Sequence, residues 1–324
     1  MKPWHGRIQQ HIQEWSSRLG NLEWWPKYVY HFTVVRNAAS ILKDGTLYSR
    51  AEAVKRGLMI VDNASPDVMS QTKQEYTHYV RLYFRPRTPT QYRNEGIRPL
   101  AKRELGGAHC PIPIYFCFDA ETILSHDNAE YSDGNMGSPR AAHSGEQDFF
   151  LQIPFGQVFH DGWFSPDRQS EIIFHRNAEV LIPDQLPLEP TLKFIACRSV
   201  AERQTFMNML DWPIKKKWEH KVRLGEQGFF ERRWTYVEEV VYTDDEIITF
   251  RFNPNTLTPG PFQLRIEYQE NGSDKVGRLE KSVERLDNVF RIRKPPNAIS
   301  GKLKLYLDNC LAYSDYIIFE DIPF

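Results

Sequence analysis

The chain has 324 residues, of which 41% are hydrophobic and 26% are charged, and its formal net charge is −1. This length and hydrophobic content suit two modest domains better than one large one. The balance of charge excludes bulk electrostatic binding of nucleic acid, so any such binding needs a local patch. We find no apolar run of about 18 residues, and the first residues lack the apolar core of a signal peptide. We therefore expect no membrane span.

The four cysteines are widely spaced and form no C-x-x-C pair: Cys110, Cys117, Cys197 and Cys310. Zinc sites and disulfide frameworks need closer or regularly spaced cysteines. We expect no metal site and a location in a reducing cytoplasm.

The first part of the chain predicts helices alternating with strands. Residues 5–19 carry apolar side chains at spacings of three and four, which indicates an amphipathic helix. Residues 28–35 are β-branched and aromatic, which favours a strand. Asn37 is a plausible helix N-cap and Gly45 stands where a helix end needs a left-handed residue, so a short helix is expected between them.

Further elements are predicted along the chain up to residue 210. Polar segments at 60–77 and 125–147 predict loops, and a loop as long as the second often carries function. The remaining predictions are strands at 78–84, 112–118, 149–154, 171–175 and 192–196, and a helix at 200–210.

The sequence changes character after residue 214. Lys215, Lys216 and Lys217 suggest a linker, and the residues beyond them alternate between apolar and polar. This alternation, interrupted by turn clusters, predicts an antiparallel β-domain, and the spacing of its strands favours a small sandwich. We expect a first domain at 1–214 and a β-rich accessory domain at 215–324.

Several common nucleotide and hydrolase motifs are absent from the sequence. It contains no G-x-G-x-x-G fingerprint, no P-loop, no H-E-x-x-H helix and no G-x-S-x-G elbow. A dinucleotide would therefore not bind in a Rossmann crevice.

Four segments carry the polar residues that matter for function. They are Tyr30-His-Phe-Thr33, the block from Tyr79-Val80 through Tyr83-Phe-Arg-Pro-Arg-Thr-Pro89, the Asp133-Gly-Asn135 loop, and Arg168-Gln-Ser-Glu171. In this order, over residues 28–210, they resemble the DarT family of DNA-modifying ADP-ribosyltransferase toxins. The chain departs from the family at Thr90, where much of the family has Met, and in the β-rich region beyond residue 215.

The resemblance implies a fold, a reaction and partners. The fold would be α+β, with an ADP-ribosyltransferase-like split β-sheet core and helices, followed here by the sandwich-like domain. The reaction would transfer ADP-ribose from NAD⁺, without a metal, to a base of single-stranded DNA. A base must leave its stack to be attacked, and this requires less free energy in a single strand than in a duplex. Such enzymes are toxins, often in antiviral defence, and we expect the antitoxin to be a separate protein.

The resemblance also implies roles for particular residues. Glu171 would be the catalytic carboxylate, because cleavage of the nicotinamide–ribose bond develops positive charge on the sugar. Arg87 would act with it and bind the pyrophosphate through its planar fork. The other residues expected to hold NAD⁺ are His31, Thr33, Tyr92 and Gln169, and those expected to contact nucleic acid are Arg93, Asp133, Asn135 and Arg168.

Each of these residues also has an ordinary structural explanation. Glutamates at strand ends are commonly solvated, and an arginine between prolines is commonly a turn residue. His31 has the surroundings of a hydrogen-bonded core histidine, while Asp133 and Asn135 are common turn residues. The basic stretch from Arg81 to Arg103 fits either a solvated face or a groove that follows phosphates.

Three alternatives to DNA modification remain open at this point. The same chemistry could act on RNA, with the β-domain recruiting it. The chain could be a non-catalytic nucleic-acid or partner-binding module, or a transferase that modifies protein. Assays with matched DNA and RNA oligomers separate the first alternative from the DNA reading.

Overall fold

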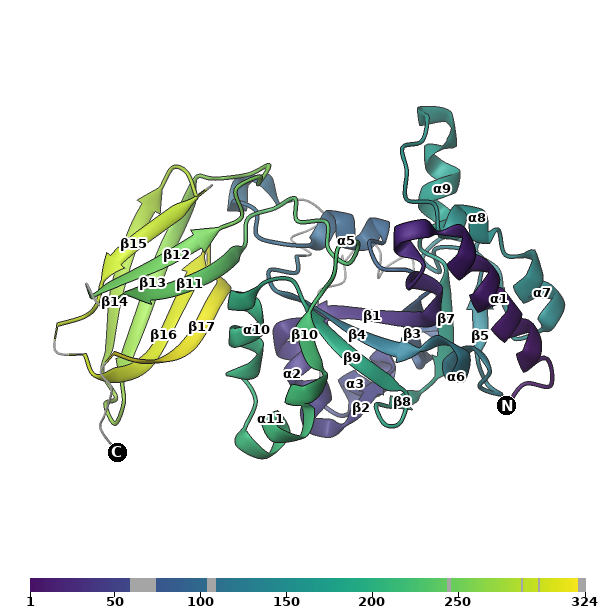
Figure 1. Ribbon diagram of the computed structural model, residues 1–324, viewed down its shortest axis with the longest axis horizontal. Helices are drawn as coiled ribbons and strands as arrows, with labels where there is room; N and C mark the ends of the chain where they lie inside the picture. Colours follow the sequence, from purple (N-terminus) through teal and green to yellow (C-terminus); the bar gives the residue numbers. More distant parts are fainter. Residues whose placement is uncertain (59–73, 104–108, 244–245, 287, 297, 320–324) are drawn as a thin grey trace.

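The computed structural model describes residues 1–58, 74–103, 109–243, 246–286, 288–296 and 298–319. A mixed α/β unit containing the N-terminus and a β-sandwich containing the C-terminus lie side by side along the long axis of the molecule (Figure 1). Most of the predicted loop at 60–77 falls outside the described residues.

The α/β unit is built on one mixed sheet. Within the described residues the order of its eight strands is β10-β9-β4-β1-β3-β7-β5-β6. The pairs are antiparallel except β9 and β10, which are parallel. The strands are β1 (Tyr28–Val34), β3 (Tyr79–Tyr83), β4 (Pro113–Asp119), β5 (Glu130–Ser132), β6 (His143–Ser144), β7 (Glu179–Pro183), β9 (Leu192–Cys197) and β10 (Val222–Leu224).

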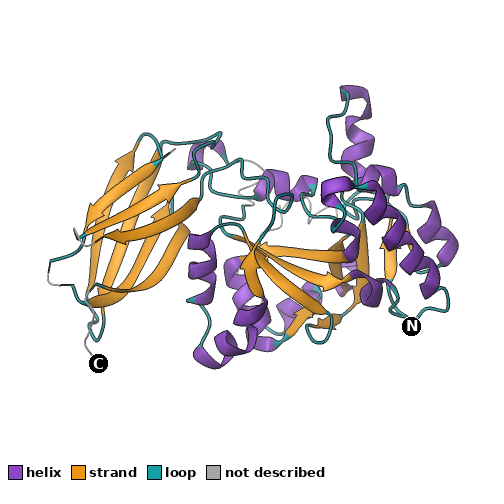
Figure 2. Cartoon of the chain, viewed as in Figure 1, coloured by secondary structure: helices purple, strands orange, loops and turns teal. Residues whose placement is uncertain are grey.

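Helices surround this sheet, and a short two-stranded ladder of β2 (Thr46–Tyr48) and β8 (Gln185–Pro187) lies beside it (Figure 2). Gly45 ends α2 in the left-handed conformation, with φ of 79°, as expected for a helix C-cap. The helices are α1 (His5–Arg18), α2 (Val35–Asp44), α3 (Arg50–Lys55), α5 (Pro89–Asn94), α6 (Ala120–Leu124), α7 (Gln147–Gln152), α8 (Phe155–Val158), α9 (Gln169–His175), α10 (Val200–Met207) and α11 (Trp212–Trp218).

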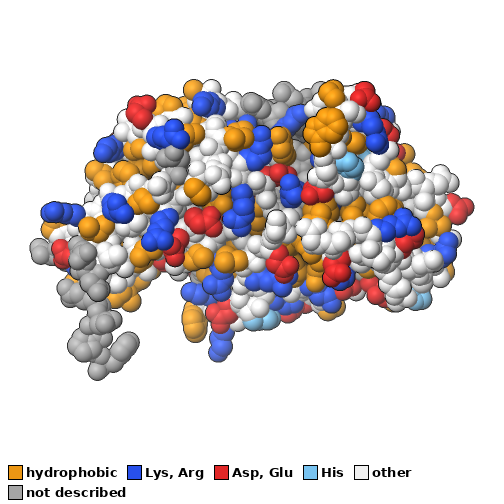
Figure 3. Space-filling model, turned by 45° about the horizontal axis from the view of Figure 1, so that its top comes forward, with side chains coloured by type: hydrophobic (Ala, Val, Ile, Leu, Met, Phe, Trp, Pro, Cys, Tyr) orange, Lys and Arg blue, Asp and Glu red, His pale blue; other side chains and the backbone are white. Residues whose placement is uncertain are grey.

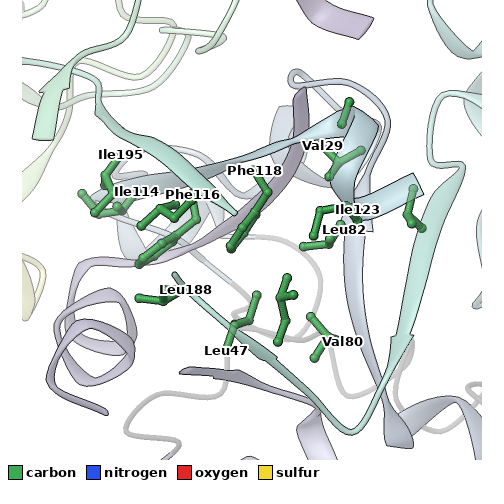
Figure 4. Close-up of a cluster of buried hydrophobic side chains, with 14 of the residues drawn as sticks. Val29, Leu47, Val80, Leu82, Ile114, Phe116, Phe118, Ile123, Leu188 and Ile195 are labelled. Carbon is green, nitrogen blue, oxygen red and sulfur yellow. The ribbon is translucent and has the colours of Figure 1, made fainter. Parts of the chain in front are cut away.

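Apolar side chains are buried on both faces of the sheet of the α/β unit. Every residue of β4 except Asp119 is buried, which agrees with its unbroken apolar sequence. Figure 4 shows how side chains from several strands meet in this core, among them Val29, Val80, Leu82, Ile114, Phe116, Phe118 and Ile195.

The C-terminal unit is a sandwich of two antiparallel sheets, ordered β11-β12-β15 and β14-β13-β16-β17. Alternate residues of β13 are buried, as expected for a strand with one face toward the core. The strands are β11 (Val237–Thr243), β12 (Ile247–Phe252), β13 (Phe262–Glu270), β14 (Val276–Val283), β15 (Val289–Arg293), β16 (Ser300–Leu307) and β17 (Cys310–Ile318).

Three predictions about local structure were wrong. Residues 149–154 and 171–175 lie in or beside helices α7 and α9 and form no strand. In the sheet, β3 pairs with the later strand β7, so neither of these two segments lies beside β3. The division after residue 214 falls too early, because Lys215–Lys217 lie within α11 and β10 pairs with β9 of the first sheet.

Candidate active site

A pocket opens where β1 and β3 diverge. Their register joins Tyr30 to Tyr83. Beyond that pair a cavity of about 210 Å³ lies between β1, α2, β2, α3 and β3. Its polar lining includes His31, Thr33, Asn37, Asp44, Arg50 and Arg81.

His31 bridges the diverging strands. Its Nδ1 lies 3.2 Å from the backbone oxygen of Arg81. Because a carbonyl can only accept, Nδ1 carries the hydrogen and donates it. Burial lowers the pKa of His31 to about 4, so the ring is neutral at physiological pH. Its Nε2 is therefore left as an acceptor, which suits a ribose hydroxyl.

A buried carboxylate lies next to this pocket. Glu179 is the first residue of β7, and its side chain is 1% exposed. Both of its oxygens are bound by the pocket-lining Arg81: Nε donates to one, and Nη2 donates to the other at 2.5 Å. Burial raises the pKa of Glu179, and the guanidinium opposes that rise. The pair is a charge-assisted, two-bond contact at the edge of the pocket.

Arg87 lies in a second cluster of charges. It does not line the pocket; its Nη1 donates to Asp161 at 3.0 Å and its Nε to Glu231 at 3.4 Å. Its backbone is in the left-handed region, with φ of 56°. The neighbouring Arg85 is 1% exposed, binds the other oxygen of Asp161 at 2.9 Å and stacks on Trp25.

Helix α5 connects the two clusters. It begins two residues after Arg87, and Thr90 in its first turn donates its hydroxyl hydrogen to Asn177 Oδ1 at 3.2 Å. Asn177 leads directly into β7 and Glu179. The position that departs from the family pattern therefore contacts the segment that places the buried carboxylate.

The predicted catalytic segment lies elsewhere. Glu171 is exposed on α9, where it accepts a hydrogen bond from Gln157 at 2.7 Å. Helix α9 projects from the body of the α/β unit (Figure 1). Gln169 and Glu171 were expected to share one face of a strand; residues two apart on a helix point in different directions, so that expectation was wrong. Arg168 is also exposed, in the turn that precedes α9.

Glu179 was not among the residues predicted from sequence, although the sequence around it carries a comparable pattern. Arg176-Asn177-Ala178-Glu179 repeats the arginine–amide–x–glutamate spacing of Arg168–Glu171. It is followed by Val-Leu-Ile, which is the stronger strand sequence. The pattern of this kind that opens a strand is therefore the one that ends at Glu179.

The remaining predicted residues lie outside the pocket lining. Asp133 Oδ1 accepts from the backbone of Ala142, and Asn135 Oδ1 accepts from the backbone of Gly137, so both side chains shape a turn. The ring of Tyr92, which was expected to hold NAD⁺, is half exposed and carries the guanidinium of Arg233 at 3.8 Å from its centroid. Arg93 is exposed beside it on α5.

The basic stretch from Arg81 to Arg103 does not form one open groove. Arg85 and Arg98 are buried, while Arg81 and Arg87 are paired with carboxylates. On the face shown in Figure 3, Lys and Arg side chains are interspersed with acidic and hydrophobic ones. Any contact with a nucleic-acid backbone therefore depends on individual residues.

The described ranges were also searched for two other kinds of feature. They contain no cluster of three or more His, Cys, Asp or Glu side chains arranged to bind a metal ion. Of the helices within them, none combines the length and the apolar character needed to traverse a bilayer.

Comparison with known proteins decides the family. The sequence model of a family described as "ssDNA thymidine ADP-ribosyltransferase, DarT" matches residues 30–229. The chain belongs to the DarT family. As a DarT-family member it is an ADP-ribosyltransferase that uses NAD⁺ as its substrate.

Two solved structures are similar to part of this DarT-family chain. Thermus sp. 2.9 DarT in complex with ADP-ribosylated single-stranded DNA is 18% identical, with a TM-score of 0.49, over 63% of this chain and 97% of that one. The Thermus sp. 2.9 DarT complex with NAD⁺ is 17% identical, with a TM-score of 0.47, over 63% and 98%. A search of curated proteins found no match.

Proposed function

We propose that this DarT-family chain transfers ADP-ribose from NAD⁺ to a thymidine base of single-stranded DNA, with Glu179 as the carboxylate at the reacting ribose. The description of the family supports the acceptor. The observation that carries the assignment of Glu179 is its position: it opens β7 and is bound through both oxygens by an arginine that lines the pocket.

The chemistry follows from these groups. The bond between nicotinamide and the ribose breaks, its electron pair leaves with nicotinamide, and positive charge develops on the sugar. A carboxylate next to the sugar stabilises that charge and binds a ribose hydroxyl. A ring nitrogen of the base then bonds to the anomeric carbon, and the carboxylate takes the proton that this nitrogen loses. Glu179 needs to exchange at least one of its bonds to Arg81 for the substrate.

Three other residues have roles in binding NAD⁺. His31 offers a neutral Nε2 acceptor to a hydroxyl of the adenosine ribose, and Thr33 lines the same pocket. Arg87 supplies positive charge for the pyrophosphate. We further propose that the chain is a toxin of a toxin–antitoxin pair with a separate antitoxin, on the strength of its family alone.

A paired substitution tests the catalytic residue. Glu179→Gln is expected to lower labelling of a thymidine-containing oligonucleotide by NAD⁺ at least about a hundredfold, because the amide supplies neither charge nor a base. Glu171→Gln is the matched control on an exposed helix, and labelling should stay within about twofold of wild type on the general tolerance of surface sites. The opposite result would return the role to Glu171.

The acceptor is tested with three oligomers of one sequence. Labelling should occur on DNA, disappear when thymidines are replaced by deoxycytidines, and be absent on the RNA version. Labelling of RNA alone would replace the proposed acceptor with the RNA alternative. Retention of label on the thymidine-free DNA would show that another base is modified.

A further inference from the structure

Glu95 joins the active-site unit to the segment that enters the β-sandwich. It is buried directly after α5 and accepts four hydrogen bonds. Arg198 and Gln91 donate from the α/β unit, at 3.1 and 2.6 Å. The backbone N–H groups of Glu231 and Arg232 donate from the connecting segment, both at 2.9 Å. A buried carboxylate needs such donors, so the segment is held in one conformation.

Fixing this backbone places the Glu231 side chain against Arg87, the arginine proposed above to bind the pyrophosphate. Glu231 is 11% exposed and accepts from Arg87 Nε at 3.4 Å. The same network holds the other end of Arg87, because Gln91 donates to Glu95 while its Oε1 accepts the backbone N–H of Arg87 at 2.7 Å. Arg87 is therefore held at its backbone and at its guanidinium by groups anchored on Glu95.

The β-sandwich holds the same segment from its other side. Asn253, which directly follows β12, accepts from the backbone of Tyr236 at 2.9 Å and donates to the backbone oxygen of Trp234 at 3.0 Å. Ser199 at the start of α10 donates to the backbone oxygen of Val237. Helix α10 lies between the two units in Figure 1. The segment from Glu231 to Val237 is thus bound by both units at once.

The match to the DarT family ends at residue 229, two residues before this contact. We propose that Glu231 is a positioning residue for Arg87, and that the β-sandwich sustains the reaction by holding the segment that carries Glu231. This inference rests on the proposed function, in which Arg87 binds the pyrophosphate. In this proposal the β-sandwich raises kcat by keeping Arg87 in place, in addition to any role in recruiting a target.

Loss of Glu231 would leave Arg87 charged but less constrained. Asp161 would remain as its ion-pair partner, and that carboxylate is shared with Arg85. A guanidinium on a long side chain loses orientation easily, and small misplacement of a positioning group is costly to turnover. The defect should therefore appear in kcat more than in the KM for NAD⁺.

A double-mutant cycle tests the proposal. Arg87→Lys, Glu231→Gln and the double variant are compared for NAD⁺ hydrolysis without DNA and for labelling of DNA. We expect Glu231→Gln to lower kcat about tenfold with a KM change below about threefold. The two substitutions should be strongly non-additive, because they remove one contact. Asn253→Ala should lower kcat in the same direction without touching Arg87.

Controls separate this inference from a general loss of stability and from failure of the proposed function. Glu238→Gln removes an exposed partner of Arg232 and should leave kcat and melting temperature unchanged. Additive effects in the cycle, or an unchanged kcat in Glu231→Gln, would overturn the positioning role. A wild-type protein that hydrolyses NAD⁺ but labels no thymidine would overturn the proposed acceptor. In that case the rates of NAD⁺ hydrolysis of the four proteins in the cycle would still test the positioning role of Glu231.

Discussion

His11 is a titratable residue with an almost wholly apolar setting. It lies in α1, and its ring contacts those of Trp15, Phe150 and Phe155. Burial lowers its pKa to about 3, well below the ordinary value of 6.5. The folded protein therefore keeps this ring neutral under conditions in which an unfolded chain would protonate it.

Stability should consequently fall as the pH falls below about 6.5. The unfolded state binds the proton first, so the loss starts there and continues toward the folded pKa near 3. When the pH is lowered from 7 to 5, His11 alone decreases the free energy of unfolding by about 2 kcal/mol. Urea unfolding of His11→Phe at the two pH values should show a decrease smaller by about this amount. An equal decrease in both proteins would contradict the buried, neutral state.

The two candidate glutamates show where residue-level prediction reached its limit. Family resemblance predicted an arginine–amide–x–glutamate segment before a strand, and the chain contains two such segments eight positions apart. Both are followed by apolar residues, so local sequence did not separate them. The pairing of β7 with β3 separates them, and that pairing depends on contacts nearly a hundred positions apart in the chain.

Among the elements, the turn at Gly134 holds the C-terminal end of α9. His175 Nδ1 donates to the backbone oxygen of Asp133 at 2.6 Å, and the backbone of Asn135 donates to that of Phe174. A Cβ at Gly134 would lie 2.3 Å from the Phe174 ring. The turn therefore has space only for glycine while the ring stays in place.

Gly134→Ala is expected to destabilise the protein by about 1–3 kcal/mol, because the ring must move out of its site. Gly6→Ala is the control: its added methyl group meets no atom within 4 Å on α1, and alanine favours the helix by about 0.5–1 kcal/mol. In thermal unfolding, the melting temperature of Gly134→Ala should be lower than that of wild type, and the melting temperature of Gly6→Ala should be higher. Equal melting temperatures would show that the turn rearranges freely.

Four of the eight described strands of the main sheet, β1, β3, β4 and β9, were predicted from sequence, and the reasons are local. These segments are rich in aromatic, aliphatic and β-branched residues, with one histidine, arginine, aspartate or lysine in each. In the sandwich, β14 gave no such signal because nearly all of its side chains are exposed. Helices α7 and α9 could not be told from strands, since short apolar runs suit both until the tertiary neighbours are fixed.

For the whole molecule, the two units share a hydrophobic core. Ile97 and Ala201, which belong to the α/β unit by sequence, are fully buried among residues of the sandwich such as Val237 and Phe250. The backbone of Ile97 also exchanges hydrogen bonds with Thr235 in the connecting segment. Units that share buried contacts of this kind unfold together more readily than units joined by a flexible linker.

Calorimetry should therefore show a single unfolding transition for the intact protein. Ile97→Ala leaves a cavity in the shared core, which costs about 2–4 kcal/mol, and should lower the melting temperature of that one transition. Leu100→Ala is a nearby control, because Leu100 is 68% exposed. Two separate transitions in wild type, with only one shifted by the variant, would show independent units.

The three fully buried thiols have a practical consequence. Cys117 and Cys197 lie in the adjacent strands β4 and β9 of the main sheet, and Cys110 lies three residues before β4. Burial raises the pKa of each of the three thiols. A thiol that is neither ionised nor accessible reacts with iodoacetamide only after the surrounding strands separate. Alkylation followed by mass spectrometry would thus time the opening of the main sheet, without any introduced label.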